Sequence, residues 1–350
     1  MNKKCEEANK RLGIGNTDSL RDNQIIFVYC SQKVGSTSLV SSLRIALNNN
    51  YTILHIHNEY TLSILYSIYN VSVMDIIQYN KEKGKKVIVI DIYRSIVEQR
   101  MSLFFENIET YHFNTRFEDT DTCKMKLIVK RFNQLFPHIK VDDHYREKYG
   151  ILCPEQFDNN NKYLRIEKDG IVFIKLRLVD SNHWSNILSD ILQEKIFIIE
   201  DYKTCDKKIS KLYSFFKNEY RMPQNIYYLL EEDKGLQYYY STEERTQYLL
   251  YWKNKTIIDS FCYFTPEQYK LYIEISNDNQ HLPQTQYDHY IDNGCVCEIC
   301  KKQRRLLFAK LCMGKTDIER INHNECILDK IKKKNDKIKK RRNVSFLLNK

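Results

Sequence analysis

The sequence predicts an α/β protein whose open, mostly parallel β-sheet is flanked by helices. Short runs rich in β-branched residues alternate along the chain with segments of helical periodicity, which is typical of parallel βαβ units. Two of these runs are followed directly by polar residues suited to binding an anion. The 350 residues, 42% of them hydrophobic and 13% aromatic, are sufficient for a buried core and exclude a wholly disordered chain.

The first half of the chain shows the alternation most clearly. Apolar runs such as KVIVIDI predict strands buried on both faces, and apolar residues recurring every three or four positions predict the helices between them. The expected strands are Gln24–Cys30, Tyr51–Ile56 and Lys86–Ile92, and the expected helices cover residues 39–47, 60–82 with a break near Asn70, and 96–105.

The second half predicts two extended segments joined by a turn, followed by further helices. The segments are Tyr163–Ile166 and Ile171–Arg177, with the turn at 168–170. Helices are expected at about 120–133, 143–149, 183–193, 206–220 and 242–253. The resulting organisation is a loose segment at 1–23, an α/β domain at 24–254, a helical or irregular C-terminal extension at 255–329, and a basic tail at 330–350.

Positive charge is concentrated at the end of the chain. The formal net charge is +10, but residues 301–350 carry 17 Lys+Arg against 5 Asp+Glu, so the first 300 residues have a balance of −2. A solvated tail of this composition could make weak, non-specific contact with nucleic acid or an anionic surface. The basic isoelectric point therefore describes the tail and not the folded body.

A loop with the composition of an anion cradle follows the first predicted strand. In Lys33-Val34-Gly35-Ser36-Thr37-Ser38, a glycine and small hydroxylated residues let backbone N–H groups point inward. The N-terminus of the following helix adds partial positive charge, and Lys33 adds a full one. The loop lacks the Gly-Lys-Ser/Thr ending of a Walker A motif, which argues against a nucleotide kinase or ATPase.

A second anion-binding pair follows the strongest strand. Arg94 stands just beyond its carboxyl end, where open α/β sheets bind ligands, and Ser102 comes eight residues later in the next helix. The forked guanidinium of an arginine can donate two hydrogen bonds to a phosphate, and a serine hydroxyl can add a third.

Together these motifs resemble the sulfotransferase superfamily, whose members use 3′-phosphoadenylyl sulfate (PAPS). Gln32–Leu39 (QKVGSTSL) looks like the family's 5′-phosphosulfate loop, and Asp91–Ser102 (DIYRSIVEQRMS) looks like its 3′-phosphate element. More narrowly, the chain is similar to bacterial-type capsular polysaccharide synthesis and carbohydrate sulfotransferase-like proteins. The run Phe-Phe-Glu-Asn after Ser102 and the stretches Tyr149–Phe157, Val172–Asp180 and Tyr240–Trp252 carry this likeness, which covers about 24–254.

The resemblance implies a P-loop NTPase-like fold and a role for each matching residue. Backbone amides of Gly35, Ser36, Thr37 and Ser38 would hold the 5′-phosphosulfate of PAPS. Lys33 would stabilise charge on the leaving group, and Arg94 with Ser102 would bind the 3′-phosphate. Many relatives have a proline before the lysine, where this chain has Gln32.

Sulfo transfer also needs a base that accepts the proton of the acceptor hydroxyl. The candidates are His57 and Glu59, which lie just beyond the second predicted strand in His55-Ile56-His57-Asn58-Glu59. Alternation would place His55, His57 and Glu59 on one side if the strand continued, and the sequence leaves the choice between His57 and Glu59 open.

Three clustered cysteines form a possible structural zinc site. Cys295, Cys297 and Cys300 stand in the sequence CVCEIC, with Cys312, His289, His323 or Cys326 as the fourth ligand. Free thiols in a reducing compartment are the alternative reading. The 11 cysteines, the lack of an apolar leader and the lack of a long apolar run favour a cytoplasmic protein without a transmembrane segment.

Two function hypotheses follow. The first is a PAPS-dependent sulfotransferase acting on a hydroxyl acceptor, with a carbohydrate expected. The second is a non-catalytic P-loop-like binding module that uses the basic tail and the cysteine cluster to bind nucleic acid or a protein partner.

Overall fold

The structure is a computed structural model that describes most of the first 269 residues. The described residues are 2–15, 20–106, 108, 125–152, 154, 156–200, 209–259, 261–267 and 269. The chain divides into two compact units. The first comprises residues 1–103, 139–210 and 219–260, and the second comprises 104–138, 211–218 and 261–350. The predicted domain at 24–254 therefore contributes to both units.

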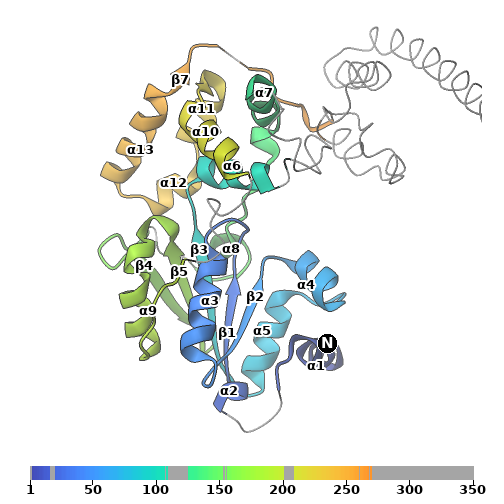
Figure 1. Cartoon of the computed structure of the whole chain (residues 1–350). Helices are drawn as coiled ribbons and strands as arrows, with labels where there is room; N and C mark the ends of the chain where they lie inside the picture. The colour runs from blue at the N-terminus through green and yellow to red at the C-terminus, as the bar shows by residue number, and fades with distance from the viewer. Residues whose placement is uncertain are drawn as a thin grey trace, which may run out of the picture. The chain divides into compact units, whose positions relative to one another are not determined.

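The first unit is built on a five-stranded sheet with the strand order β2-β1-β3-β5-β4 (Figure 1). Neighbouring strands are parallel except for β5 and β4, which pair antiparallel as a hairpin. The strands are β1 Gln24–Tyr29, β2 Thr52–Ile56, β3 Lys86–Tyr93, β4 Tyr163–Lys168 and β5 Ile171–Arg177. The prediction of an α/β fold with a mostly parallel sheet is confirmed.

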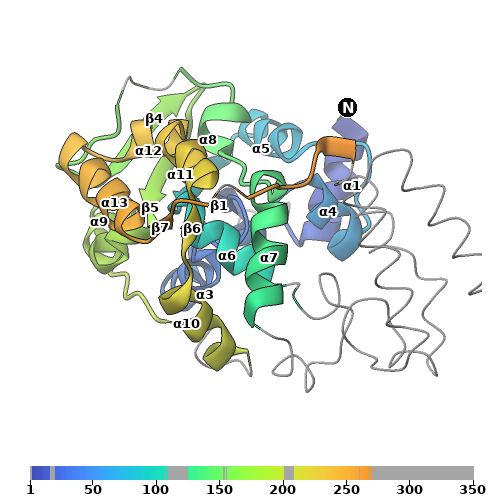
Figure 2. The ribbon, with the colours of Figure 1, turned by 90° about the horizontal axis from the view of Figure 1, so that it is seen from above.

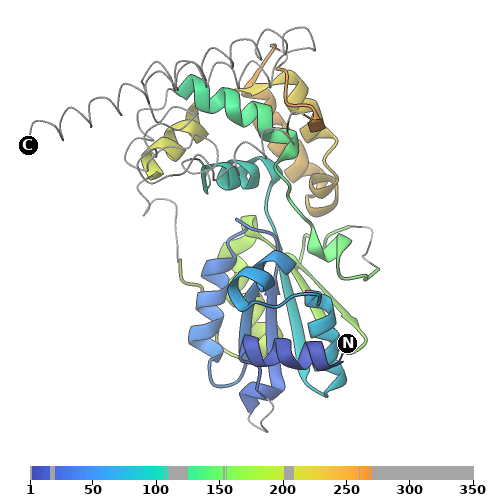
Figure 3. The same ribbon diagram turned by 90° about the vertical axis from the view of Figure 1, so that its right-hand side faces the viewer.

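Helices cover both faces of this sheet. On one face, α3 (Ser36–Leu47) and α9 (Trp184–Leu192) pack against inward residues such as Ile88 and Ile90 of β3. On the other, α1 (Asn2–Leu12) and α5 (Val73–Glu82) pack against Val87 and Val89. Figure 3 shows α3 and α5 on opposite sides of the sheet. Burial on both faces explains why the central strands are almost uninterrupted apolar runs.

Side chains cap several helices of this unit. Ser72 begins α5 and Ser241 begins α13, each in a reciprocal capping box with an acidic residue three positions on. The other elements are α2 Leu20–Asn23, α4 Glu59–Tyr66, α6 Ile96–Glu106, α8 His144–Glu147, α11 Gln224–Glu231, α12 Lys234–Tyr239, α13 Thr242–Asn254, the two-residue strands β6 Met222–Pro223 and β7 Thr256–Ile257, and a 3₁₀ turn at Leu178–His183.

The N-terminal segment is ordered where the sequence predicted a loose one, so that expectation is wrong for residues 2–12. Helix α1 buries Cys5, Ala8 and Leu12, which share one helical face because they are three and four residues apart. Its Asn9 exchanges two 2.9 Å amide hydrogen bonds with Asn80 of α5. The two helices lie side by side (Figures 2 and 3). A face this narrow in a polar segment gave too weak a signal in the sequence.

The described part of the second unit is held by aromatic side chains. Helix α7 (Met125–Leu135) and the 3₁₀ turn Phe136–His138 contribute Phe132 and Phe136, and α10 (Ser210–Glu219) contributes Phe216. The ring centroid of Phe132 lies 5.6 Å from that of Phe136 and 5.3 Å from that of Phe216, and both ring pairs are edge to face. Such pairs stabilise beyond the area that they bury. Where they are described, the helices predicted near 120–133 and 206–220 are confirmed.

Among the described residues, no helix has the length and apolar character needed to cross a bilayer. The extension predicted at 255–329 is described only to residue 269. The basic tail at 330–350 lies outside the described residues.

Candidate functional site

The carboxyl ends of β1 and β3 form a topological switch point. These strands are neighbours, yet the chain leaves β1 through α3 toward β2 on one side and leaves β3 toward the β4–β5 hairpin on the other. Open α/β sheets bind ligands where connections diverge in this way. The loop at 31–35 follows β1, and Arg94 follows β3, so both sequence-predicted anion motifs flank the switch point.

The loop adopts a tight, left-handed path into α3. Lys33 has φ +62° and Gly35 has φ +86°. Gly35 is the N-cap of α3, and no side-chain capping hydrogen bond is made at this position. A Cβ at Gly35 would lie 2.6 Å from Cδ1 of Leu178. Only glycine fits here without strain, because it tolerates positive φ and leaves room for the neighbouring leucine.

The predicted cradle residues occupy the first turn of this helix. Ser36 is only 4% exposed, and Thr37 and Ser38 are half-buried. The N-terminal turn of a helix offers backbone N–H groups and partial positive charge to an anion.

Two side chains from the neighbouring segment hold the loop. Arg94 donates from Nη1 to the Lys33 carbonyl oxygen at 2.7 Å. Gln99 donates from Nε2 to the Gln32 carbonyl oxygen at 2.8 Å and to Oγ of Ser31 at 3.1 Å. The structure therefore joins Arg94 to the loop, and it places Ser102 in the same helix as Gln99 at 6% exposure.

The candidate base His57 directly follows β2 and lies beside His55, a residue of that strand. Their ring centroids are 4.6 Å apart. Nε2 of His55 is 2.9 Å from Oγ of Ser36, and Nδ1 of His57 is 2.9 Å from the Cys30 carbonyl oxygen. Because a carbonyl oxygen can only accept, Nδ1 of His57 carries a proton, and in the neutral ring Nε2 keeps its lone pair.

Glu59 follows a different course from the one that strand alternation would give. The strand ends at Ile56, and Glu59 is the first residue of α4, whose N-cap is Asn58. Oε1 of Glu59 accepts a hydrogen bond from the hydroxyl of Tyr29 at 3.1 Å, and Oε2 lies 3.9 Å from Nζ of Lys148. Alternation therefore relates His55 to His57 and does not extend to Glu59.

Electrostatics separates the two candidate bases. Burial lowers the pKa of His57, the hydrogen bond to Cys30 offsets part of this, and the charges of His144 and Lys33 lower it further. Burial raises the pKa of Glu59, but hydrogen bonds from backbone N–H groups and the charge of Lys148 outweigh it, so its pKa is lowered overall. At neutral pH the imidazole is thus uncharged, and the carboxylate is ionised and weakly basic.

A buried ion cluster that joins β3 and β5 was not predicted from the sequence. Nζ of Lys175 lies 2.7 Å from Asp91 and 3.0 Å from Asp143, and both Lys175 and Asp91 are almost fully buried. The hydroxyl of Tyr239 donates to Asp143 at 2.7 Å. Burial lowers the pKa of Lys175, but the two carboxylates outweigh it and raise the pKa overall. A lysine within the apolar run IVFIKLR and an aspartate within KVIVIDI were the available signal.

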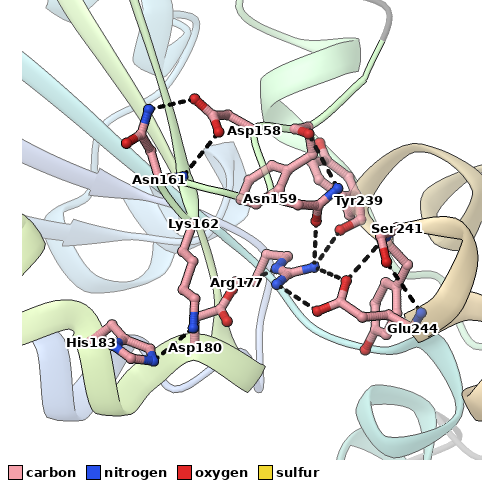
Figure 4. A network of polar contacts seen from close by, with 12 residues as sticks. Asp158, Asn159, Asn161, Lys162, Arg177, Asp180, His183, Tyr239, Ser241 and Glu244 are labelled. Atoms are coloured by element: carbon pink, nitrogen blue, oxygen red, sulfur yellow. Dashed lines mark hydrogen bonds and ion pairs between the residues drawn. The ribbon is translucent and has the colours of Figure 1, made fainter.

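A second missed network surrounds Arg177 at the carboxyl end of β5 (Figure 4). The guanidinium donates to Asp180 at 2.5 Å and to both oxygens of Glu244 in α13, at 2.6 and 3.0 Å. It also donates to the Tyr239 carbonyl oxygen at 2.7 Å and to Asn159 at 3.1 Å. Beside it, Nζ of Lys162 donates to His183 at 2.7 Å. This network ties α13 to the sheet.

No cluster of three or more His, Cys, Asp or Glu residues suited to a metal ion occurs among the described residues. The predicted zinc ligands Cys295, Cys297, Cys300 and Cys312 lie outside the described part of the chain. No family model, curated protein or solved structure matches this chain.

Proposed function

We propose that this protein is a sulfotransferase that moves a sulfo group from PAPS to a hydroxyl acceptor, with a carbohydrate as the expected acceptor. The proposal includes a P-loop-like fold for the segment formed by β1, the loop at 31–35 and α3. One observation carries it: the Lys33–Gly35 loop and Arg94 meet at the switch point, joined by the 2.7 Å bond between Arg94 and the Lys33 carbonyl. A donor with a 5′-phosphosulfate and a 3′-phosphate requires two anion sites next to each other.

PAPS would be bound by residues on both sides of the hydrogen bond between Arg94 and Lys33. Backbone amides from Gly35 to Ser38 would receive the 5′-phosphosulfate at the start of α3. A guanidinium has five N–H donors, and the bond to Lys33 uses one Nη1 direction, so the fork can also serve a 3′-phosphate. Ser102 would add its hydroxyl from α6, where its side chain is buried.

The transfer is a substitution at sulfur. The oxygen of the acceptor hydroxyl forms a bond to sulfur, and the bond between sulfur and the bridging phosphate oxygen breaks. Adenosine 3′,5′-bisphosphate leaves with that electron pair, and Lys33 stabilises the negative charge that develops on the bridging oxygen. The hydroxyl proton passes to the base.

His57 is the better base of the two candidates. Its Nδ1 proton is committed to the Cys30 carbonyl, so Nε2 is the basic atom, and the lowered pKa keeps the ring neutral at pH 7. Glu59 is already engaged by Tyr29 and Lys148, and its lowered pKa makes it a poor proton acceptor. The positive charge of Lys33 is one of the causes that lower the pKa of His57.

Calorimetric titration with adenosine 3′,5′-bisphosphate tests the donor site. The full-length chain should bind it, and Arg94→Met should weaken binding at least tenfold, because a bidentate charge-assisted contact is lost. Arg165→Met is the matched control, since Arg165 lies exposed on the edge strand β4. No binding by the unmodified protein, or equal binding by Arg94→Met, would overturn the proposal.

Transfer of labelled sulfate from PAPS to a panel of glycans tests the reaction itself. His57→Asn should lose transfer while retaining affinity for the bisphosphate, and Glu59→Gln should retain most of the transfer. The rate for the unmodified protein should fall in acid below the ordinary pKa of a histidine, because the protonated imidazole cannot accept a proton.

A further inference from the structure

Gln99 makes a contact that the anion motifs do not account for. Its side chain is 4% exposed, and a single Nε2 atom donates both to the Gln32 carbonyl oxygen and to Oγ of Ser31. The carbonyl can only accept, so the nitrogen and not the oxygen of the amide faces the loop. Gln99 therefore binds the backbone of the loop one residue before its left-handed turn at Lys33.

That turn needs support. Lys33 has φ +62°, in the left-handed region that is strained for a residue with a Cβ. Strained backbone of this kind persists only where surrounding contacts hold it. The neighbouring carbonyls of Gln32 and Lys33 accept from Gln99 and Arg94, at 2.8 and 2.7 Å. Both donors come from the short segment after β3, with Gln99 in α6.

The same guanidinium that would bind the 3′-phosphate is thus bonded to the backbone of the 5′ loop. Fixing Arg94 through a ligand also fixes the Lys33 carbonyl, and loss of Arg94 frees it. The two halves of the donor site are coupled through one side chain, with Gln99 as the second support of the loop.

We propose that Gln99 is a positioning residue for the 5′-phosphosulfate loop and that Arg94, besides contacting the 3′-phosphate, shares this role. The inference rests on the proposed function, since it concerns the same donor site. Gln99 and Arg94 are expected to affect the binding of different sets of ligands. Gln99 acts on ligands that carry a 5′ group, and Arg94 acts on ligands that carry either group.

Three nucleotides distinguish these effects in titrations of the full chain. They are adenosine 5′-phosphosulfate, which lacks a 3′-phosphate, adenosine 3′-monophosphate, which lacks a 5′ group, and adenosine 3′,5′-bisphosphate. Gln99→Met should weaken binding of the first and third by the same factor, about tenfold for the two hydrogen bonds lost, and leave the second unchanged. Arg94→Met should weaken all three.

A purely structural role for Gln99 would weaken all three nucleotides together or none. Gln78→Met, on the exposed side of α5, is the matched control and should change nothing. If Gln99→Met does not fold, Gln99→Asn keeps the amide but shortens it by one methylene, and the same pattern is expected from it.

The inference is overturned if Gln99→Met binds adenosine 5′-phosphosulfate as the unmodified protein does, or if Arg94→Met affects only ligands with a 3′-phosphate. In both cases the proposed function stands, because the unmodified protein still binds the bisphosphate. If the unmodified protein binds none of the three nucleotides, the proposed function and the inference fall together.

Discussion

Arg177 is the last residue of β5 and Arg94 directly follows β3, the parallel neighbour of β5, yet their surroundings are opposite. Arg177, 1% exposed, donates to Asp180, to Glu244 and to a backbone carbonyl, so its charge is neutralised within the chain. Arg94 is half-buried, and its hydrogen bond goes to the carbonyl of Lys33 in a strained loop. An arginine enclosed by carboxylates of its own chain holds structure together. An arginine bonded to a backbone carbonyl retains its positive charge for a ligand.

The largest loss of stability is expected when Arg177 is replaced. Arg177→Met should lower the free energy of unfolding by about 3–5 kcal/mol, because it leaves Asp180 and Glu244 without their buried cation. Chemical denaturation measures this, with the exposed Arg165→Met as control. A loss below about 1 kcal/mol would mean that Arg177 is not the structural member of the pair.

Acid should destabilise the loop region before it destabilises the Arg177 network. Burial, together with the charges of His57 and Arg44, lowers the pKa of His55 to about 4. The unfolded chain therefore binds a proton that the folded chain does not, and stability falls as the pH drops from about 6.5 toward 4. For His55 alone the loss is on the order of 2–3 kcal/mol.

The pKa of Glu244 is also lowered, despite its burial, by Arg177, so its contribution is lost only below the ordinary pKa of a glutamate. Unfolding measured between pH 7 and 5 thus reports mainly on buried histidines. His55→Asn should flatten this slope, since asparagine does not titrate. An unchanged slope would show that His55 is not held neutral beside Ser36.

Glycine at position 35 can be tested against a glycine in open space. Gly35→Ala should destabilise by about 1–2 kcal/mol through its positive φ, and further through displacement of Leu178. Gly84→Ala shares the positive φ, at +80°, but meets nothing within 4 Å. The difference in unfolding free energy between the two variants isolates the packing of the loop, and equal values would exclude that packing.

The smallest effect on stability is expected from Arg94→Met, at about 1 kcal/mol, because it removes one partly solvated hydrogen bond to a carbonyl. The same denaturation experiment measures it beside Arg177→Met. A loss as large as that of Arg177→Met would mean that both arginines mainly stabilise the fold, and it would weaken the donor-site proposal.

Much of the fold could be predicted because its signals are local. The apolar runs at Gln24–Tyr29 and Lys86–Tyr93, and the helical spacing after each, depend only on near neighbours in the chain. The candidate loop and Arg94 could be placed for the same reason, since each directly follows a strand. Helix α1 was missed because its few apolar residues become a buried face only when α5 packs against them.

The amino-acid sequence by itself determined the order of the strands and helices, the glycine-containing loop after β1, and the arginine after β3. Only the tertiary structure decided that Arg94 and Gln99 bond to that loop across more than 60 residues. It likewise decided that Lys175 and Asp91 form a buried pair 84 residues apart. Periodicity and turn chemistry act between neighbours in sequence, whereas hydrogen bonds and desolvated charges act between neighbours in space, which only the folded chain specifies.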